Sequence, residues 1–491
     1  MLIKSPPIDL YSATEARALD TFTIEELNIP AVSLMTRAGE AAFRCIEQNW
    51  RNARKVFLVC GVGNNAGDAY VLARILHQHA YQVQLVQVMR NAKLSPTAES
   101  CYQAMLEAGV LPNEEQFSIN QADIIVDAIF GVGLNRDAEG DYGVAIEQIN
   151  LANKPVLSLD IPSGLNASTG RVMGSAVRAS MTISFMTAKL GLFTADGPDH
   201  AGQILVDNLN TPHTAYDTIR SGVQALIHNK VRDLLPARAR AGHKGTHGHA
   251  IIIGGAAGYR GALLLAAEAA ARVGAGLVTM CGYASGPELI NTERPELMYR
   301  GIDQAQEMRD LFARAKVIAI GPGLGTDKSA SARFATALET HLPLVVDADA
   351  LRLLAAQPIE RDNWVLTPHP GEAALLLDCT VDDIQSDRLA AAREIVVRFG
   401  GAVILKGVGS IVVTDFGNEV LLHGNPGMGS GGMGDVLTGV IGGLLAQGLS
   451  IAQATRLGAC VHARAGDRAA KDGERGMLAR DLMPHIRRLV N

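Results

Sequence analysis

The segment Asn425-Pro-Gly-Met-Gly-Ser-Gly-Gly-Met-Gly-Asp-Val-Leu-Thr-Gly439 combines six glycines with a single carboxylate directly before an apolar run. After Gly434 the apolar residues recur at helical spacing, which predicts a helix with Asp435 at its N-terminus. Glycines let a backbone close around phosphate oxygens, and the free N–H groups of a first helical turn attract anions. The segment therefore predicts an anion-binding loop with a base at its mouth, typical of phosphoryl chemistry. A glycine-rich turn between core elements is the alternative.

The composition is that of a globular chain with more than one domain. Its 491 residues, 48% of them hydrophobic and 19% charged, exceed the length of one ordinary domain. The aromatic content of 4% and the 51 glycines suit closely packed α/β layers. The formal net charge of −6 argues against a general nucleic-acid or membrane-surface binder. We expect two α/β domains and neither a nucleic-acid nor a membrane partner.

The cysteines and the first residues indicate a cytoplasmic protein. Six cysteines lie far apart and form no Cys-x-x-Cys pair, so they are interpreted as reduced, mostly buried and not zinc-binding (Cys45, Cys60, Cys101, Cys281, Cys379 and Cys460). The stretch 1–10 has one charge before two prolines and no apolar core of signal length.

Apolar, β-rich runs alternate with amphipathic stretches twice along the chain, as in parallel sheets covered by helices. In the first half the predicted strands are 55–60, 82–87, 123–128, 155–160 and 181–185, with helices such as 68–79 and 97–108. The second half restarts at 249–254 and continues through 276–281, 317–321, 344–347, 364–367, 402–406 and 410–414. We place the domain boundary near residue 220, which gives domains 1–220 and 221–491.

Three glycine-containing turns of the first half follow predicted strands, at 61–69, 127–136 and 160–166. Because the carboxyl ends of parallel strands share one edge of a sheet, side chains from these turns are expected to converge (Asn65, Asp127, Asp160 and Ser163). Amide and carboxylate oxygens of Asn64, Asn65 and Asp68 suit a hard cation or hydroxyl groups. Capping of the following helix is the alternative for these three residues.

Several motifs resemble known families. Gly63-Asn-Asn-Ala-Gly-Asp68, Asp160-Ile-Pro-Ser-Gly164 and Thr187-Ala-Lys-Leu-Gly191 are similar to the NAD(P)H-hydrate epimerase family. The second half resembles the ADP-dependent NAD(P)H-hydrate dehydratases, which are ribokinase-like, through seven motifs in order: Lys244-Gly-Thr-His-Gly248, Gly258-Tyr-Arg-Gly-Ala262, Arg294-Pro-Glu-Leu-Met298, Gly321-Pro-Gly-Leu-Gly325, Asp347-Ala-Asp-Ala-Leu351, Thr367-Pro-His-Pro-Gly-Glu372 and Gly431-Gly-Met-Gly-Asp-Val-Leu-Thr-Gly439. The resemblance spans nearly the whole chain.

The resemblance implies an N-terminal Rossmann-like three-layer sandwich and a C-terminal ribokinase-like three-layer sandwich. It implies a repair enzyme for NADH and NADPH hydrated at C6 of the nicotinamide ring (NADHX and NADPHX). The first domain would interconvert the R and S epimers. The second would use ADP as co-substrate to dehydrate the S epimer, releasing AMP and phosphate.

For the dehydratase, the resemblance and the chemistry assign Asp435 as the base that accepts the C6 hydroxyl proton during phosphoryl transfer. The nucleotide-binding positions that the resemblance implies are Lys406, Gly407, Val408, Gly409, Ser410 and Gly434. The hydrate-binding positions that it implies are Ala262, Gly323, His369 and Asp435. Asp347 and Asp349 either help to hold Mg²⁺ or cap a helix. His243, His247 and His249 lack carboxylate or cysteine partners nearby and are not assigned to a metal.

For the epimerase, the resemblance implies K⁺ bound by Asn65, Asp127 and Ser163, with Asp160 as the acid/base group. The substrate-binding positions that it implies are Asn64, Asn65, Ala66, Gly67, Asp68, Gly131, Val132, Gly133, Leu134, Asn135, Arg136, Asp137 and Asp160.

Two alternatives remain. Ribokinase-like vitamin and sugar kinases have a similar Gly-x-Gly-Asp segment, so the second domain is alternatively a small-molecule kinase. Ala66 and Ala69 stand where the epimerases usually have glycine, so the first domain is alternatively a non-catalytic binding or assembly domain. A homo-oligomer is expected, of a size that the sequence does not indicate.

Overall fold

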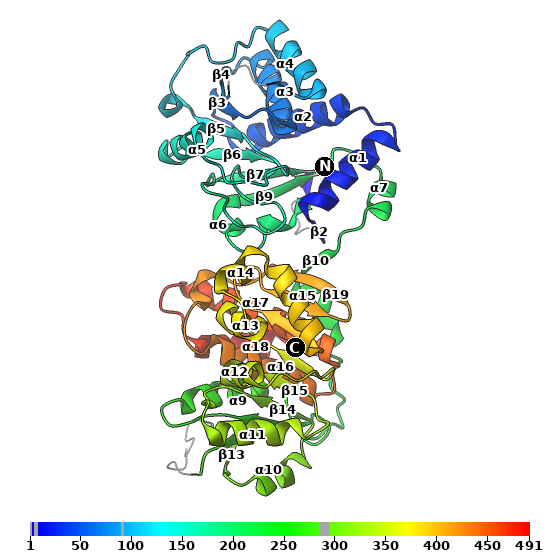
Figure 1. Ribbon diagram of the computed structural model, residues 1–491, viewed down its shortest axis with the longest axis vertical. Helices are drawn as coiled ribbons and strands as arrows, with labels where there is room; N and C mark the ends of the chain where they lie inside the picture. Colours follow the sequence, from blue (N-terminus) through cyan, green and yellow to red (C-terminus); the bar gives the residue numbers. More distant parts are fainter. Residues whose placement is uncertain (1, 4–7, 90–92, 285–293) are drawn as a thin grey trace. The chain divides into compact units, whose positions relative to one another are not determined.

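The computed structural model describes residues 2–3, 8–89, 93–284 and 294–491, and the chain divides into two compact units (Figure 1). These units are Met1–Ala225 and Leu226–Asn491, so the division falls within the strand β10 (Val223–Leu226).

The first unit is built on a mostly parallel sheet with the strand order β1-β9-β7-β6-β5-β3-β4. All neighbouring pairs from β9 to β4 are parallel, and only β1 runs antiparallel to β9. The strands are β1 (Leu2–Ile3), β3 (Lys55–Cys60), β4 (Gln82–Gln87), β5 (Ile124–Ala128), β6 (Val156–Leu159), β7 (Met181–Phe185) and β9 (Gln203–Asp207). The short β2 (Asp9–Tyr11) pairs with β8 (Ala188–Lys189) and β10.

Both faces of this sheet are buried. Along β3, Val56 and Leu58 belong to a cluster that includes residues of helices α2 and α3, while Phe57 and Val59 belong to a second cluster with residues of α5. This alternation explains why the strand is apolar throughout, as parallel strands are when helices cover both faces. The helices are α1 (Ala13–Glu25), α2 (Ala31–Asn49), α3 (Asn64–Gln78), α4 (Pro96–Glu107), α5 (Asp141–Leu151), α6 (Gly197–Ala201) and α7 (His213–Thr218). The predicted Rossmann-like three-layer sandwich is confirmed.

The sheet of the second unit has the strand order β13-β12-β11-β14-β15-β16-β17-β18-β19. It is parallel from β13 to β17 and antiparallel from β17 to β19. The strands are β11 (His249–Ile253), β12 (Leu277–Gly282), β13 (Met298–Gly301), β14 (Val317–Ile320), β15 (Leu344–Val346), β16 (Trp364–Leu366), β17 (Ala402–Leu405), β18 (Ile411–Thr414) and β19 (Gly417–Leu421).

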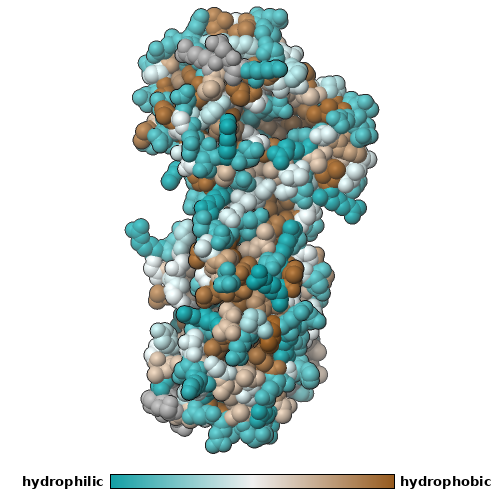
Figure 2. Space-filling model, viewed as in Figure 1, coloured by the Kyte–Doolittle hydropathy of each residue, from teal (hydrophilic) through white to brown (hydrophobic). Residues whose placement is uncertain are grey.

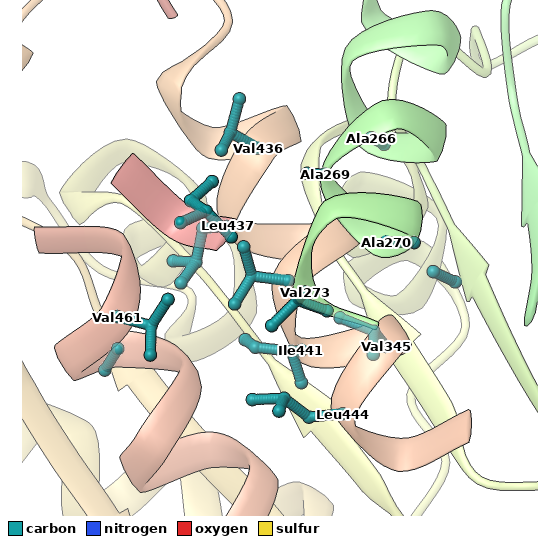
Figure 3. Packing of buried hydrophobic residues seen from close by; sticks show 14 of the residues in the cluster. Ala266, Ala269, Ala270, Val273, Val345, Val436, Leu437, Ile441, Leu444 and Val461 are labelled. Carbon is teal, nitrogen blue, oxygen red and sulfur yellow. The ribbon is translucent and has the colours of Figure 1, made fainter. Parts of the chain in front are cut away.

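The largest core of the second unit lies between its sheet and helices α9, α16 and α17 (Figure 3). Ala266 and Ala270 on α9 face Ile441 and its neighbours on α16, and Ala250 and Ile252 of β11 belong to the same cluster. Ile251 and Ile253, at the alternating positions of β11, are equally buried, so this sheet too is covered on both faces. The helices are α8 (His228–Val231), α9 (Arg260–Val273), α10 (Ala305–Phe312), α11 (Lys328–Leu338), α12 (Ala348–Ala356), α13 (Pro370–Leu377), α14 (Val381–Ser386), α15 (Arg388–Phe399), α16 (Met433–Ala446), α17 (Ile451–Ala469) and α18 (Met483–Leu489).

Hydrophilic and hydrophobic residues are interspersed over the face shown in Figure 2. Among the helices of the described residues, none has the length and the apolar character needed to cross a membrane. All six cysteines are free, and all but Cys379 are buried, as predicted.

Candidate active sites

The turns of the first unit surround a cavity of about 610 Å³ at the carboxyl edge of its sheet. The residues that carry polar chemistry into this cavity come from α1, from the start of α3, from the turns after β5 and β6, and from β8. Among them are Arg17, Asp20, Asn64, Asn65, Asp68, Arg136, Asp160 and Lys189.

Asn65 lies in the first turn of α3, whose N-cap is Gly63 without a side-chain hydrogen bond. The helix therefore begins four residues before its predicted start at 68, and the capping interpretation of Asn64 and Asn65 is wrong. The Asn65 amide donates to the carbonyls of Phe130 (2.9 Å) and Leu159 (3.1 Å), which fixes its orientation. Its Oδ1 is buried and accepts no hydrogen bond from the described residues. An oriented, unpaired amide oxygen is costly unless something binds it.

Asp127 and Ser163 lie next to each other, as predicted from the shared sheet edge. The Ser163 hydroxyl donates to Asp127 Oδ1 (2.5 Å), and the Ser163 N–H donates to Asp127 Oδ2 (2.8 Å). Ser163 also accepts a hydrogen bond from the Phe130 N–H, so the turns after β5 and β6 are tied together. The side-chain oxygens of Asp127 and Ser163 are of the kind that a hard monovalent cation prefers as ligands.

Asp160 follows β6 with a positive φ of 67°, a conformation that is uncommon for a residue other than glycine. Its Oδ1 accepts hydrogen bonds from the Lys189 ammonium and from the Phe185 N–H. The Lys189 side chain is only 3% exposed and also donates to the Phe185 carbonyl (2.6 Å). Asp160 is therefore held by a buried ion pair at the wall of the cavity.

Two further carboxyl groups share this cavity. Burial raises the pKa of Asp20 to about 6, and Asp160 adds to the rise while Lys189 opposes it. Burial and the charges of Asp160 and Asp20 raise the pKa of Asp68 well above its usual range. The cavity thus combines one ion-paired carboxylate with two carboxyl groups that are easily protonated.

Most of the substrate-binding positions implied by resemblance line this cavity (Asn64, Asn65, Asp68, Gly131, Val132, Gly133, Leu134, Asn135, Arg136 and Asp160). Ala66, Gly67 and Asp137 do not. Ala66 is fully buried in the core, and a Cβ on Gly67 would lie 2.3 Å from Met35 Sδ. These two residues thus face the packing between helices rather than the cavity.

In the second unit the glycine-rich segment leads into α16, which begins at Met433 after Gly432, a residue in the left-handed region. Asp435 therefore lies in the first helical turn, as predicted. Burial raises the pKa of Asp435 to about 7, with further contributions from Asp347 and Asp349, although Lys406 lowers it. A carboxyl group with this pKa can exchange its proton near neutral pH, which a general base must do.

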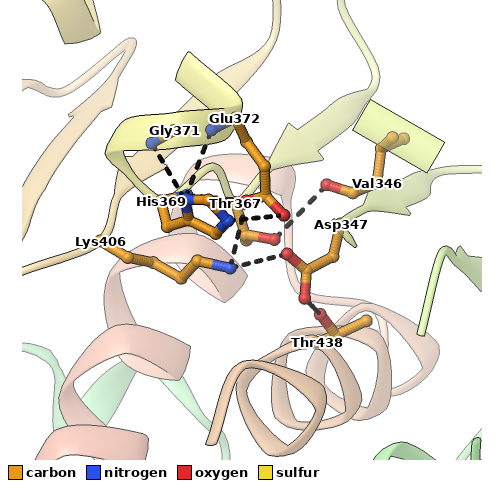
Figure 4. Close-up of polar contacts among 8 residues, drawn as sticks. All are labelled: Val346, Asp347, Thr367, His369, Gly371, Glu372, Lys406 and Thr438. Atoms are coloured by element: carbon orange, nitrogen blue, oxygen red, sulfur yellow. Dashed lines mark hydrogen bonds and ion pairs between the residues drawn. The ribbon is translucent and has the colours of Figure 1, made fainter. Parts of the chain in front are cut away.

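Beside Asp435 lies a network of buried charges (Figure 4). The Lys406 ammonium is 2.8 Å from Asp347 Oδ1 and 3.7 Å from Glu372 Oε2. Asp347 Oδ2 accepts a hydrogen bond from the Thr438 hydroxyl (2.7 Å) on α16. Burial opposes ionisation of Asp347, but the positive charge and hydrogen bond of Lys406 keep its pKa below the usual value. A Cβ on Gly434 would lie 3.4 Å from Lys406 Nζ, so the ammonium lies at the anion-binding end of α16.

The hydrate-binding positions implied by resemblance lie on turns that follow neighbouring strands. The His369 side chain is 56% exposed and caps α13, since its Nδ1 accepts from the N–H groups of Gly371 and Glu372. Gly323 follows β14 with φ 58°, and a Cβ there would lie 2.5 Å from the Cβ of Tyr259, in the turn before α9. Ala262 lies in the first turn of that helix. Because these strands are neighbours in the order β11-β14-β15-β16-β17, the turns that follow them lie at the same edge of the sheet.

The turn after β17 contains the proposed nucleotide segment. Gly407 (φ 140°) and Gly409 (φ 58°) have conformations that favour glycine. The buried Arg388 donates to the carbonyls of Leu405 and Lys406, and the Ser410 hydroxyl donates to the Gly407 carbonyl. Val408, at the tip of the turn, is exposed. The turn is thus held in place by Arg388 while its tip stays open to a ligand.

Asp347 and Asp349 have different partners. Asp347 makes no capping hydrogen bond, and its two oxygens are engaged by Lys406 and Thr438. Asp349 Oδ2 accepts from the Gly325 N–H (2.8 Å). Among the described residues no group of three His, Cys, Asp or Glu side chains is placed to hold a metal ion. The His249 ring contacts the Thr279 hydroxyl and the Arg314 carbonyl.

Sequence reasoning missed Asp20, Lys189, Glu372 and Thr438 as site residues. Lys189 and Glu372 lie inside motifs that carried the resemblance, and Thr438 is one turn after Asp435, so helical spacing offered a signal for that residue. Asp20 lies in an ordinary amphipathic helix and had no such signal.

The fold and the sites define a two-domain α/β enzyme, with a polar cavity in a Rossmann-like unit and a phosphate-binding helix N-terminus in the second unit. Residues 31–191 match the family model of the YjeF-related protein N-terminus, and residues 250–488 match that of NAD(P)H-hydrate dehydratase. The bifunctional NAD(P)H-hydrate repair enzyme Nnr of Coxiella burnetii is 41% identical over 486 residues, 98% of this chain and 99% of the relative. That of Escherichia coli is 38% identical over 494 residues, 99% of this chain and 95% of the relative.

Among solved structures, a ribokinase-like superfamily protein from Enterococcus faecalis has a TM-score of 0.51 and 27% identity, covering 55% of this chain and 95% of that chain. The chain belongs to the family of bifunctional NAD(P)H-hydrate repair enzymes. The predicted combination of an epimerase with a ribokinase-like dehydratase is confirmed, and the kinase and non-catalytic alternatives are not supported.

Proposed function

We propose that residues 226–491 dehydrate the S epimers of NADHX and NADPHX with ADP as phosphoryl donor, and that residues 1–225 interconvert the R and S epimers. The observation that carries the proposal is Asp435, which lies beside the Lys406–Asp347 pair at a helix N-terminus suited to an anion. Its carboxyl group forms no ion pair among the described residues. Its pKa of about 7 matches the work of a base.

In the dehydratase, Asp435 accepts the proton of the C6 hydroxyl while that oxygen attacks the terminal phosphorus of ADP. The phosphorus–oxygen bond to AMP breaks with its electron pair on the AMP oxygen. The C6–O bond of the new phosphate ester then breaks with its electron pair on the departing phosphate, and a C5 proton passes to water as the C5=C6 bond forms. Phosphate departs far more readily than hydroxide, so the phosphoryl transfer makes the elimination feasible.

Charge on the transferring phosphoryl group would be stabilised by the N–H groups of residues 431–434, which lead into the first turn of α16, and by the Lys406 ammonium. The turn 406–410 would hold the AMP part, and Ala262, Gly323 and His369 the hydrate. Mg²⁺ would reach the site with the nucleotide and neutralise phosphate charge there. Asp349 suits it better than Asp347, whose two oxygens are already engaged.

In the epimerase, Asp160 would act as an acid/base group at the wall of the cavity. Asn65, Asp127 and Ser163 would hold K⁺, and the buried, unpartnered Oδ1 of Asn65 supports this ligand set. A bound K⁺ would supply positive charge beside the C6 oxygen. The ring of the hydrate would lie against the turn 131–136, which lines the same cavity.

The test is the recovery of dihydronicotinamide absorbance from a mixture of both NADHX epimers with the purified chain, ADP, Mg²⁺ and K⁺. Complete recovery is expected. Recovery that stops at the S-epimer fraction would contradict the epimerase assignment, and a stable phosphorylated product would contradict the dehydratase assignment.

The surroundings of the enzyme are part of the proposal. The free and mostly buried cysteines support a reducing compartment, which we take to be the cytoplasm. A homo-oligomer is expected, and light scattering coupled to size-exclusion chromatography tests it.

A further inference from the structure

We propose that Asp20, on α1, is a second acid/base group of the epimerase cavity and works as a pair with Asp160. The inference rests on the proposed epimerase function of the first unit. It concerns a residue that precedes the part of the chain matched by the N-terminal family model, which starts at residue 31.

The helix that carries Asp20 is fixed at several points. Ser12 and Glu15 form a capping box at its start, and the Ala13 N–H donates to Ser168 Oγ (2.9 Å). Glu15 Oε1 also accepts from the Gly222 N–H (2.9 Å). The neighbour of Asp20, Leu19, is fully buried in the main core of the unit. Since adjacent helical residues point in directions about 100° apart, the burial of Leu19 leaves Asp20 at the wall of the cavity.

Asp20 differs from Asp160 in its partners. Asp160 is bound by Lys189 and by the Phe185 N–H. No hydrogen bond or ion pair engages the Asp20 carboxyl group within the described part of the chain, although it interacts electrostatically with both members of that pair. Asp160 is thereby engaged in an ion pair, whereas burial raises the pKa of Asp20 to about 6. Two carboxyl groups with such different surroundings in one cavity suit an acid and a base.

Other charged or titratable groups lie near Asp20. Burial raises the pKa of Asp68 on α3 well above its usual range. Burial raises the pKa of Tyr216 on α7 to about 12, so it stays neutral. Arg17 lies one turn before Asp20, lines the same cavity and donates to the Val132 carbonyl. A change of charge near pH 6 is therefore expected of Asp20.

The chemistry needs both groups. In one direction Asp20 gives its proton to the C6 hydroxyl oxygen, the C6–O bond breaks with its electron pair on oxygen, and the ring nitrogen lone pair forms a C6=N bond. A water molecule then adds to the other face of C6, and its proton passes to Asp160 while the nitrogen regains its lone pair. The reverse direction exchanges the two roles. Atoms and charge balance over the cycle once the proton returns from Asp160 to Asp20 through water.

The experiment measures the rate of R–S exchange of NADHX in the full-length chain without nucleotide, from pH 5 to pH 8. Asp20→Asn is expected to lower kcat/KM for exchange by about 10²- to 10³-fold, the usual contribution of one acid/base group. Since kcat/KM reports groups of the free enzyme, the wild-type rate should fall as pH rises through about 6, where Asp20 loses its proton. This fall of kcat/KM with pH, the limb near pH 6, should be absent in Asp20→Asn. It should be retained in Asp20→Glu, at a lower overall rate.

Three controls keep the outcomes separate. Glu25→Gln changes an exposed carboxyl group of the same helix and should leave exchange unchanged. ADP-dependent dehydration of the S epimer should also stay unchanged in Asp20→Asn, which reports that the second unit of the same chain is folded, while circular dichroism and thermal unfolding report on the first unit. Asp160→Asn tests whether R–S exchange takes place at the proposed epimerase site.

Exchange within about threefold of wild type in Asp20→Asn, with the limb near pH 6 still present, would overturn the role of Asp20 if Asp160→Asn abolishes exchange. If exchange persists in both variants, the proposed epimerase site fails together with it. Loss of exchange in Glu25→Gln as well would show that α1 acts only through the fold.

Discussion

The two sites share one arrangement, in which an ion pair lies beside a further carboxyl group. They differ in which of the carboxyl groups is the acid/base candidate. Each has a lysine paired with an aspartate, Lys189 with Asp160 and Lys406 with Asp347. Beside the pair lies a carboxyl group, Asp20 or Asp435, that forms no ion pair with the residues that the structure describes. In the second unit the proposed base is the unpaired residue. In the first unit the residue that motifs singled out is the paired one.

This difference shows what an ion pair does to an aspartate. A lysine close by stabilises the carboxylate and lowers its tendency to take up a proton, while burial without a partner has the opposite effect. Asp347 and Asp435 illustrate both cases within one site, since the pKa of Asp347 is lowered and that of Asp435 is raised to about 7. The comparison therefore predicts that the unpaired carboxyl group titrates during turnover in both sites.

The largest effect is expected from Asp435→Asn, which removes the proposed base of the second site. Dehydration of the S epimer should fall by about 10³-fold in kcat, within the range of one general base. R–S exchange in the same chain should not change, and ADP binding should persist. Stopped-flow absorbance for turnover and calorimetry for ADP give the two values. Substantial remaining dehydration would contradict the assignment.

The next prediction concerns the pair beside that base. Because Asp435 must be ionised to accept a proton, kcat/KM for dehydration should rise with pH through about 7 in the wild type. Lys406→Met removes the charge that lowers the pKa of Asp435, so the rise should move to higher pH. Asp347→Asn removes the neighbouring charge that raises this pKa most, so the rise should move to lower pH.

Each of these two variants also leaves a charged or polar partner unpaired inside the site. Removal of one member of a buried ion pair costs about 3 kcal/mol. Denaturant unfolding measures that loss, and the pH profile has to be recorded well below the unfolding transition. Shifts of both variants in the same direction would contradict the proposed coupling of the pair to Asp435.

A smaller effect is expected in the first site, at the unpaired oxygen of Asn65. Asn65→Ala removes that oxygen, and the K⁺ concentration that half-activates exchange should rise by at least about 10-fold, as is usual when a metal site loses a contributing group. Titration of exchange activity with KCl at constant ionic strength measures it. Dehydration in the same chain is the control. An unchanged K⁺ response would place the cation elsewhere.

Sequence patterns predicted much of the fold because parallel strands covered on both faces are apolar throughout and end in glycine-containing turns. The observed bounds of β3 and β4 are those predicted, and Asp435 lies in a first helical turn as its spacing indicated. The convergence of Asn65, Asp127 and Ser163 also followed from the shared sheet edge.

Ion pairs between distant segments were not predictable in this way. Lys189 and Asp160 are 29 positions apart, and Lys406 and Asp347 are 59 apart, without any periodic relation that would reveal the contact. The sequence likewise gave no sign that the Lys406 ammonium lies beside Gly434. Asp20 was missed because burial, which raises its pKa, is a property of the cavity and has no local pattern.

The smallest effect is expected at Ala66, and it tests whether the first site tolerates a methyl group where relatives of the epimerase usually have glycine. The helices that carry the two sites differ in what a methyl group near their N-termini contacts. On α16 a Cβ on Gly434 would lie 3.4 Å from Lys406 Nζ, in the site. On α3 the methyl of Ala66 is fully buried in the core. Ala66→Gly should lower the free energy of unfolding by about 1 kcal/mol, from lost helix propensity, and leave R–S exchange unchanged. Gly434→Ala is the matched change in the second site, where the added methyl faces the reacting groups and should slow dehydration. A faster exchange in Ala66→Gly would show that the methyl restricts the cavity, which its burial in the core argues against.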